Sequence, residues 1–83
     1  MYKIIYSKRA KKDSKIVEQA GFKEKVVELL KIIKTNPFQN PPPYEKMLGY
    51  SNKYSRRINQ KHRLVYVVWE NEILIQQMWT HYE

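Results

Sequence analysis

Hydrophobic residues recur at helical spacing through the first half of the chain, after a short opening segment of a different kind. Residues 2–7 (YKIIYS) are β-branched and aromatic, which favours a strand, and Ser7 is suited to cap a following helix. From 8 to 20 the apolar residues fall near one side of a helix, and a glycine follows as a stop signal. Residues 22–35 repeat apolar side chains at three- and four-residue steps. The short link between these two segments predicts an antiparallel helical hairpin.

The second half of the chain follows a different pattern, in which prolines give way to alternating apolar and polar residues. Residues 36–46 (NPFQNPPPYEK) hold all four prolines, which exclude a helix interior or a central strand, so a loop is expected there. Beyond it, the alternation of β-branched and aromatic residues with polar ones indicates strands. They are expected at 53–59, 62–70 and 73–82, with tight hairpin turns between them and a weak strand or irregular lead-in at 47–51.

This order of elements, one strand, a helical hairpin and then three or four strands, predicts an α+β fold. With 83 residues, a single domain spanning 1–83 is expected. The hairpin should cover one face of a small, largely antiparallel sheet, because each helix has one apolar side to bury. The other face of the sheet is then where a functional site is expected.

The charge balance adds a partner to this picture. The chain has 16 Lys and Arg residues against 8 Asp and Glu residues, which gives a formal net charge of +8. A small domain this basic points to a polyanionic partner such as nucleic acid, the ribosome or an acidic protein. The segment from Lys46 to Trp69 holds six basic residues and no acidic one, and three of the four arginines lie in it. Arginine binds phosphate through a planar, bidentate fork, so this segment is the better candidate for an anion site.

Composition and motifs exclude several classes of protein. No apolar run approaches the roughly 18–20 residues of a membrane span, and the opening residues lack the order of a signal peptide. There is no cysteine, which excludes disulfides and thiolate metal sites, and a cytoplasmic protein is the simplest interpretation. The two glycines form no phosphate-binding loop, and the two histidines lack carboxylates at ligand spacing. Neither a metal nor another cofactor is therefore expected.

The chemistry-bearing residues that remain are one carboxylate, two or three arginines, one histidine and one tyrosine. These are the parts of a metal-free ribonuclease. RNA supplies its own nucleophile, the 2′-OH, and cleavage needs a base to take that proton and an acid to protonate the leaving 5′ oxygen. It also needs cations to stabilise the charge on the phosphorane.

Strand alternation limits which arginines can share one face of the sheet. With a two-residue turn after Asn59, Arg63 lies across from Ile58 and shares a face with Arg56. A bulge or a longer turn places Arg57 there instead. The choice between the two arginines is open at this point.

Alternation also separates the last two aromatic side chains of the chain. His81 and Tyr82 are neighbours in the sequence, so a regular strand points them to opposite faces. Both can reach one site only if the strand changes course. A bend or bulge near Thr80 is therefore expected, while the role of the final residue, Glu83, stays open.

Four segments of the chain together resemble a known family. The motifs NPF, YEK, YSRRINQKHRLVY and a terminal HY are similar, in this order, to those of the YoeB/Txe toxins of bacterial toxin–antitoxin pairs, within the RelE-like superfamily. The resemblance covers nearly the whole chain. It implies a RelE-like fold and a metal-independent ribonuclease that enters the ribosomal A site and cleaves mRNA there.

The resemblance also implies a role for each motif residue. Glu45 is the general base, Arg63 binds the phosphate and the transition state, and Arg57 is a supporting contact to the RNA. His81 is the general acid, and Tyr82 stacks on or positions a nucleotide.

The partners implied by the family are an acidic, partly disordered antitoxin of the YefM/Phd type, mRNA on the ribosome, and operator DNA bound through the toxin–antitoxin complex. A homodimer is compatible with the family, and no membrane is involved. Two other functions remain open. One is a binding module for nucleic acid or the ribosome without catalysis. The other is a gyrase poison of the related ParE type, which needs no terminal His-Tyr pair.

Overall fold

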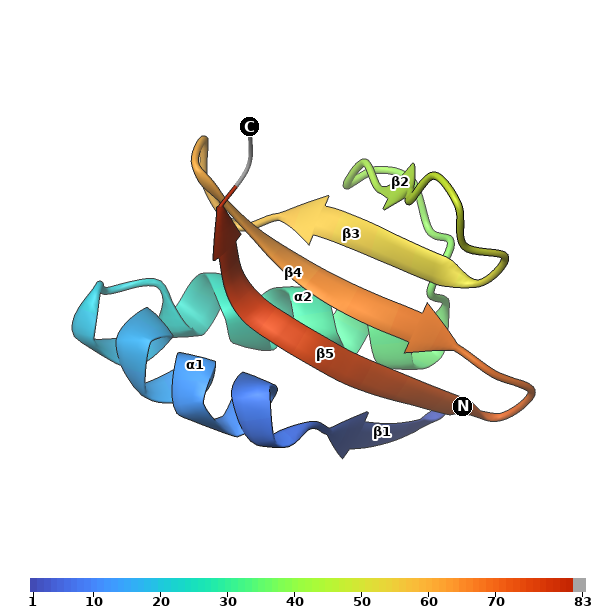
Figure 1. Ribbon diagram of the computed structural model, residues 1–83, viewed down its shortest axis with the longest axis horizontal. Helices are drawn as coiled ribbons and strands as arrows, with labels where there is room; N and C mark the ends of the chain where they lie inside the picture. The colour runs from blue at the N-terminus through green and yellow to red at the C-terminus, as the bar shows by residue number, and fades with distance from the viewer. Residues whose placement is uncertain (82–83) are drawn as a thin grey trace.

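Two helices and five strands form two layers in the computed structural model, which describes residues 1–81. The elements are β1 (Lys3–Tyr6), α1 (Lys8–Gln19), α2 (Lys23–Thr35), β2 (Glu45–Lys46), β3 (Lys53–Arg57), β4 (His62–Val68) and β5 (Glu72–His81). The strands form one sheet in the order β1-β5-β4-β3-β2, in which β1 pairs with β5 in parallel and the other neighbours are antiparallel. Both helices lie on the same side of this sheet (Figure 1). The predicted α+β fold with a helical hairpin is therefore confirmed.

The first turn of α1 is fixed by Ser7, as the sequence predicts. Its Oγ accepts a hydrogen bond from the backbone N–H of Ala10 at 2.9 Å, which satisfies one of the free donors at the helix start. The same hydroxyl donates to the carbonyl oxygen of Gln76 at 2.7 Å. Gly21 follows α1 with a φ of 84°, a conformation that glycine adopts without strain. One serine thus both caps α1 and ties it to β5.

The core lies between the helices and the sheet. Its buried side chains come from both helices and from the strands β4 and β5, and they include Ala10, Leu29, Ile33, Leu64 and Ile73. Each helix contributes the apolar stripe that its sequence period predicts, and burying these stripes against the sheet is the main favourable contribution to folding.

The strand boundaries differ from the sequence prediction where local pattern is weak. The lead-in at 47–51 forms no strand, and the expected loop instead contains the short strand β2, in which Glu45 pairs with Ser55. The strand β3 ends at Arg57 instead of residue 59. The strand β2 is only two residues long. A strand this short cannot be recognised in the sequence, because an alternating pattern needs several residues to repeat.

The bend expected near Thr80 is present as two irregularities in the pairing of β4 with β5. The register shifts once between Tyr66 and Val65 and again between Val65 and Arg63. Each shift inserts an extra residue on β5, and such bulges increase the twist and bend of a strand. Figure 1 shows the strong curvature of β5 toward its end.

A buried carboxylate from α1 supports this irregular part of β5. Oδ2 of Asp13 accepts a hydrogen bond from the backbone N–H of Met78 at 3.1 Å, and Oδ1 receives the Nε–H of Arg9 at the same distance. Asp13 is 3% exposed. It therefore satisfies a backbone donor in the bulged stretch of β5, where a buried unpaired N–H would be unfavourable.

Candidate active site

An ion pair on the free face of the sheet joins three neighbouring strands. Nη2 of Arg63 in β4 donates to Oε1 of Glu45 in β2 at 3.0 Å, and Nη1 donates to Oγ of Ser55 in β3 at 2.8 Å. Ser55 lies directly across the ladder from Glu45. The guanidinium of Arg63 thus forms a hydrogen bond with Ser55 in β3 and an ion pair with Glu45 in β2. Together these two contacts hold its fork in a defined plane.

The register of β3 and β4 decides which arginine joins Arg63. Arg57 pairs directly with Arg63, and Arg56 pairs with Leu64. Residues directly opposite in a ladder share a face, so Arg57 and Arg63 lie together. The two-residue turn that would have placed Arg56 there is wrong, because the chain turns through a longer loop closed by the hydrogen bond from Ile58 N to His62 O at 2.9 Å.

Arg56 has a structural position on the opposite face, where it is 1% exposed. Its guanidinium donates to the carbonyl oxygens of Pro42 at 2.6 Å, Gln39 at 2.9 Å and Pro37 at 3.0 Å. A fourth bond runs from its Nε to the hydroxyl of Tyr66, which itself donates to the Pro37 carbonyl. Arg56 thereby holds the proline-rich loop against the sheet.

That loop leads directly into Glu45, so its attachment determines where the carboxylate lies. Aromatic side chains reinforce the attachment, because the ring of Tyr54 packs edge-on against Phe38 and Tyr44, with centroids 5.1 and 5.9 Å apart. A set of buried hydrogen bonds and ring contacts orders a segment that would otherwise be free to move. Glu45 is consequently presented from a fixed connector and not from a mobile loop.

The electrostatics of this face favour an ionised carboxylate. The hydrogen bond from Arg63 and the charge of that residue lower the pKa of Glu45 from its ordinary value, and the charge of Arg57 adds to the effect. Burial opposes this change only in part. Glu45 is therefore held in its ionised form next to two guanidinium groups.

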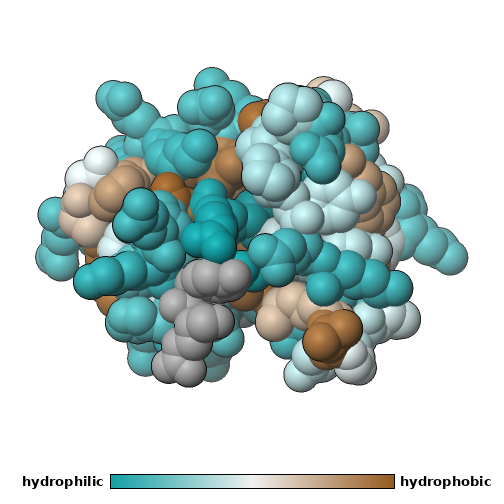
Figure 2. Space-filling view, turned by 90° about the horizontal axis from the view of Figure 1, so that it is seen from above, coloured by the Kyte–Doolittle hydropathy of each residue, from teal (hydrophilic) through white to brown (hydrophobic). Residues whose placement is uncertain are grey.

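The concavity beside these residues is small. Its volume is about 30 Å³, and its lining is formed by Pro43, Tyr44, Glu45, Ser55, Arg57 and Arg63. A depression of this size is too small to enclose a nucleotide base, but its charged rim can contact a phosphate on an extended strand. Figure 2, which views the molecule from above, shows hydrophilic residues gathered near the centre of that face.

His81, the last residue of β5, is exposed and lies directly across from His62. Its neighbour Thr80 is the residue that faces Arg63. Because successive residues of a strand point to opposite faces, His81 is directed to the face opposite the arginines. Each of the two bulges in β5 changes the face to which the following side chains point, so the two bulges together restore the original alternation. Its imidazole can approach Arg63 only around the end of the sheet.

The structure thus brings Glu45, Arg57 and Arg63 together and places His81 at the adjoining corner of the sheet. The predicted roles of Tyr82 and Glu83 concern positions that lie outside the described residues. Sequence reasoning missed Ser55, which orients Arg63, and it interpreted His62 only as a turn residue. The register could have identified both, because each is the direct ladder partner of a predicted site residue.

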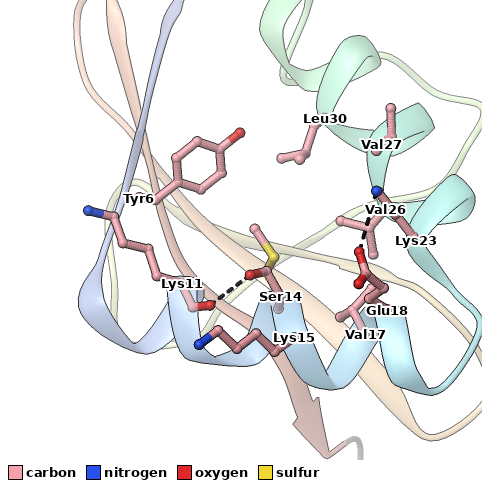
Figure 3. A pocket seen from close by; sticks show the side chains of 11 residues that line it. Tyr6, Lys11, Ser14, Lys15, Val17, Glu18, Lys23, Val26, Val27 and Leu30 are labelled. Atoms are coloured by element: carbon pink, nitrogen blue, oxygen red, sulfur yellow. Dashed lines mark hydrogen bonds and ion pairs between the residues drawn. The ribbon is translucent and has the colours of Figure 1, made fainter.

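A second concavity lies between the two helices, away from the arginines. It has a volume of about 380 Å³, and Val17, Val26, Leu30 and Met78 contribute apolar surface to it. Figure 3 shows Lys11 and Lys15 on the α1 side of the opening, with Lys23 at its far end in an ion pair with Glu18. The groove therefore combines an apolar floor with a mainly basic rim.

Within residues 1–81, no group of three or more His, Cys, Asp or Glu side chains is placed to hold a metal ion. Over the same residues, neither helix is long and apolar enough to cross a membrane.

Sequence comparison places nearly the whole chain in one family. The family model described as YoeB-like toxin of bacterial type II toxin-antitoxin system matches residues 2–82. The toxin YoeB of Escherichia coli (strain K12) is 39% identical over 62 residues, which cover 71% of each protein.

Two solved structures from Staphylococcus aureus extend the likeness to the fold. The YoeB dimer is 38% identical, superimposes with a TM-score of 0.85, and is matched over 98% of both chains. A YoeB chain in a heterotetrameric YoeB–YefM toxin–antitoxin complex is 37% identical, with a TM-score of 0.81 and 99% of both chains covered. The sequence motifs and the fold of the chain therefore indicate the same family.

Proposed function

The chain belongs to the YoeB-like toxins of bacterial type II toxin–antitoxin systems, and on that basis we propose that it is a ribosome-dependent endoribonuclease that cleaves mRNA in the ribosomal A site. The observation that carries the proposal is the joint presence of Glu45, Arg57 and Arg63 on one face of the sheet. This is the combination of an ionised base and two phosphate-binding cations that cleavage of RNA requires. Such a toxin acts in the cytoplasm and inhibits translation.

The reaction uses the 2′-OH of the substrate as the nucleophile. Glu45 takes the proton from that hydroxyl, and the 2′ oxygen forms a bond to the adjacent phosphorus. The bond from phosphorus to the 5′ oxygen breaks, and His81 in its protonated form gives a proton to that oxygen. The products are a 2′,3′-cyclic phosphate, or a 3′-phosphate after hydrolysis, and a 5′-OH. Tyr82 stacks on or positions a nucleotide beside the reacting group.

Arg63 has two functions in this scheme. In the free protein its fork holds Glu45 and Ser55, and in the complex it also binds the non-bridging oxygens of the phosphate, together with Arg57. A phosphate that takes over part of the fork removes the interaction that most lowers the pKa of Glu45. Substrate binding therefore makes Glu45 a stronger base at the moment when it is needed.

The partners proposed for the chain follow from its charge and its groove. An acidic antitoxin of the YefM/Phd type would bind apolar side chains in the groove between α1 and α2 and acidic ones along Lys11 and Lys15. The complex of toxin and antitoxin would bind operator DNA. A homodimer is the further assembly that the S. aureus YoeB dimer supports.

Purified protein in a translating extract with a defined mRNA tests the catalytic proposal. Primer extension should show cleavage in the A-site codon by the wild type and a loss of at least a hundredfold for His81→Gln and Glu45→Gln. Glu24→Gln is the matched control, because it removes a carboxylate from the first turn of α2 and should cleave as the wild type does.

Unchanged mRNA, or equal cleavage by the wild type and His81→Gln, would overturn the proposed catalysis. Pulse labelling after induction separates the remaining functions. An early stop in DNA synthesis with protein synthesis continuing indicates a gyrase poison. Arrested translation with intact mRNA indicates a binding module without catalysis.

A further inference from the structure

Four aromatic rings form a continuous column from the core to the end of β5. Phe22, at the start of α2, contacts Trp79, with ring centroids 5.8 Å apart. The ring of His62 also stacks on Trp79, at 3.8 Å and with only 10° between the planes. The ring of His81 follows at 4.8 Å from His62, tilted by 45°. His62 therefore lies between a tryptophan packed against the core and an exposed histidine.

The orientation of His62 is fixed by Asn59 in the turn before β4. Oδ1 of Asn59 accepts the backbone N–H groups of Lys61 and His62, both at 2.8 Å, so this atom is an acceptor. Nδ1 of His62 lies 3.2 Å from the same oxygen and must carry the proton in that contact. The ring plane of His62 is set by Trp79 and its rotation by Asn59.

The surroundings of His62 also favour the neutral ring. Burial lowers the pKa of His62, and the charges of His81 and Lys61 lower it further. The other two rings of the column, those of Phe22 and Trp79, are uncharged. The ring of His81 lies 4.8 Å from that of His62, and a neutral His62 places no charge beside it.

We propose that His62 is a positioning residue for His81, and that the stack of His62 on Trp79 holds the imidazole of His81 at the end of the sheet, from which it can reach the arginine face around the strand end. The inference rests on the proposed role of His81 as the acid. His81 is exposed at the end of β5, so its side chain would otherwise sample several rotamers. A general acid, however, must be oriented to within a fraction of an ångström. The flat face of His62 restricts that freedom without adding a charge.

Two substitutions of the same residue separate the flat ring from the rest of the side chain. His62→Ala removes the platform, and we expect kcat for cleavage to fall about ten- to a hundredfold with KM changed less than threefold. His62→Phe keeps a flat, neutral ring on Trp79 and should restore kcat to within about fivefold of the wild type. Gln60→Ala, in the same turn, is the control and should leave both constants unchanged.

A second measurement on the free protein does not depend on activity. Nuclear Overhauser contacts between the rings at positions 62 and 81, and the order parameter of the His81 side chain, should be high in the wild type and in His62→Phe and low in His62→Ala. Equal ring order or equal kcat in the wild type and His62→Ala overturns the positioning role. An inactive wild type with the predicted ring order instead refutes the proposed function and leaves the positioning intact.

Discussion

Nη2 of Arg63 lies 3.0 Å from Oε1 of Glu45, although 18 residues separate them in the chain. The pair joins β2, which follows the prolines of the loop, to β4 at the centre of the sheet. It also places the proposed base in contact with the cation that is proposed to bind the phosphate. The pair therefore couples the protonation of Glu45 to the occupancy of Arg63.

The first prediction concerns that coupling. In Arg63→Gln the pKa of Glu45 should rise towards its ordinary value, because the hydrogen bond and the charge that lower it are lost. Carbon-detected NMR titration of the Glu45 carboxyl measures the change. Lys53→Gln removes a cation from the other end of β3 and is the control. An unchanged titration curve in Arg63→Gln would contradict the interpretation.

The same shift determines how the pair contributes to stability at different pH. A depressed pKa in the folded state means that the contribution is present above the unfolded pKa of Glu45 and is lost as the pH falls through the folded one. The contribution is expected to be small, because the Glu45 side chain is 59% exposed and solvent screens the charge. The difference in unfolding free energy between the wild type and Arg63→Gln should therefore shrink in acid.

Substitution by glutamine should affect the stability of the protein strongly at Arg56 and hardly at all at the adjacent Arg57. Arg56→Gln should lower the free energy of unfolding by about 3 kcal/mol or more, because three loop carbonyls and the Tyr66 hydroxyl lose a buried charged donor. Arg57→Gln should change it by less than about 0.5 kcal/mol, since Arg57 is exposed. Urea denaturation measures both.

Cleavage by the same two variants completes the comparison. Arg57→Gln should reduce kcat/KM about tenfold or more at unchanged stability, because a phosphate contact is removed. If Arg56→Gln were as stable as the wild type, the loop would not depend on Arg56. If Arg57→Gln cleaved normally, Arg57 would not be a substrate contact.

A third prediction separates charge from hydrogen bonding at Asp13. Asp13→Ala should destabilise the protein by about 1–3 kcal/mol, because the buried N–H of Met78 loses its acceptor. Asp13→Asn retains an oxygen at that place and should be less destabilising. Hydrogen exchange at the Met78 amide, compared with global unfolding, would reveal the effect locally. Equal stability of the two variants would show that the carboxylate charge and not the acceptor matters.

The groove between the helices provides a fourth prediction. Val27→Asp and Lys15→Glu should each weaken binding of the acidic segment of the cognate antitoxin about tenfold, because one places a negative charge among the apolar residues that line the groove and the other reverses a charge on the rim. Calorimetry with a synthetic segment measures the affinity, and mRNA cleavage should be unchanged. Lys12→Glu on α1, which does not line the groove, is the control. Equal affinities for Lys12→Glu and Lys15→Glu would place the antitoxin elsewhere.

Local pattern was enough to predict the elements with long repeats. The apolar stripe of α2 and the alternation of β4 each extend over a full element, so neighbouring residues carry the signal. The sequence likewise confined the candidate cations to residues 46–69, where no acidic residue lies. The resemblance to the YoeB/Txe toxins then identified Arg57 in preference to Arg56.

The remaining part of the site depends on register, which local pattern does not contain. The choice between Arg56 and Arg57 rests on the length of the turn after β3, and one residue more or less moves every side chain to the other face. The two bulges of β5 were expected only as a bend near Thr80. Their consequence, that His81 returns to the face of His62 and Trp79, follows from the pairing alone.

By itself the sequence determined the order of elements, the amphipathic side of each helix and the basic segment, because these properties depend on residues within a few positions of one another. Only the tertiary structure decided that Arg63 holds Glu45, that Arg56 is buried under the proline-rich loop, and that His62 lies between Trp79 and His81. The physical reason is that these contacts join residues from separate strands. Hydrogen-bonded register, and not side-chain preference, brings such residues together.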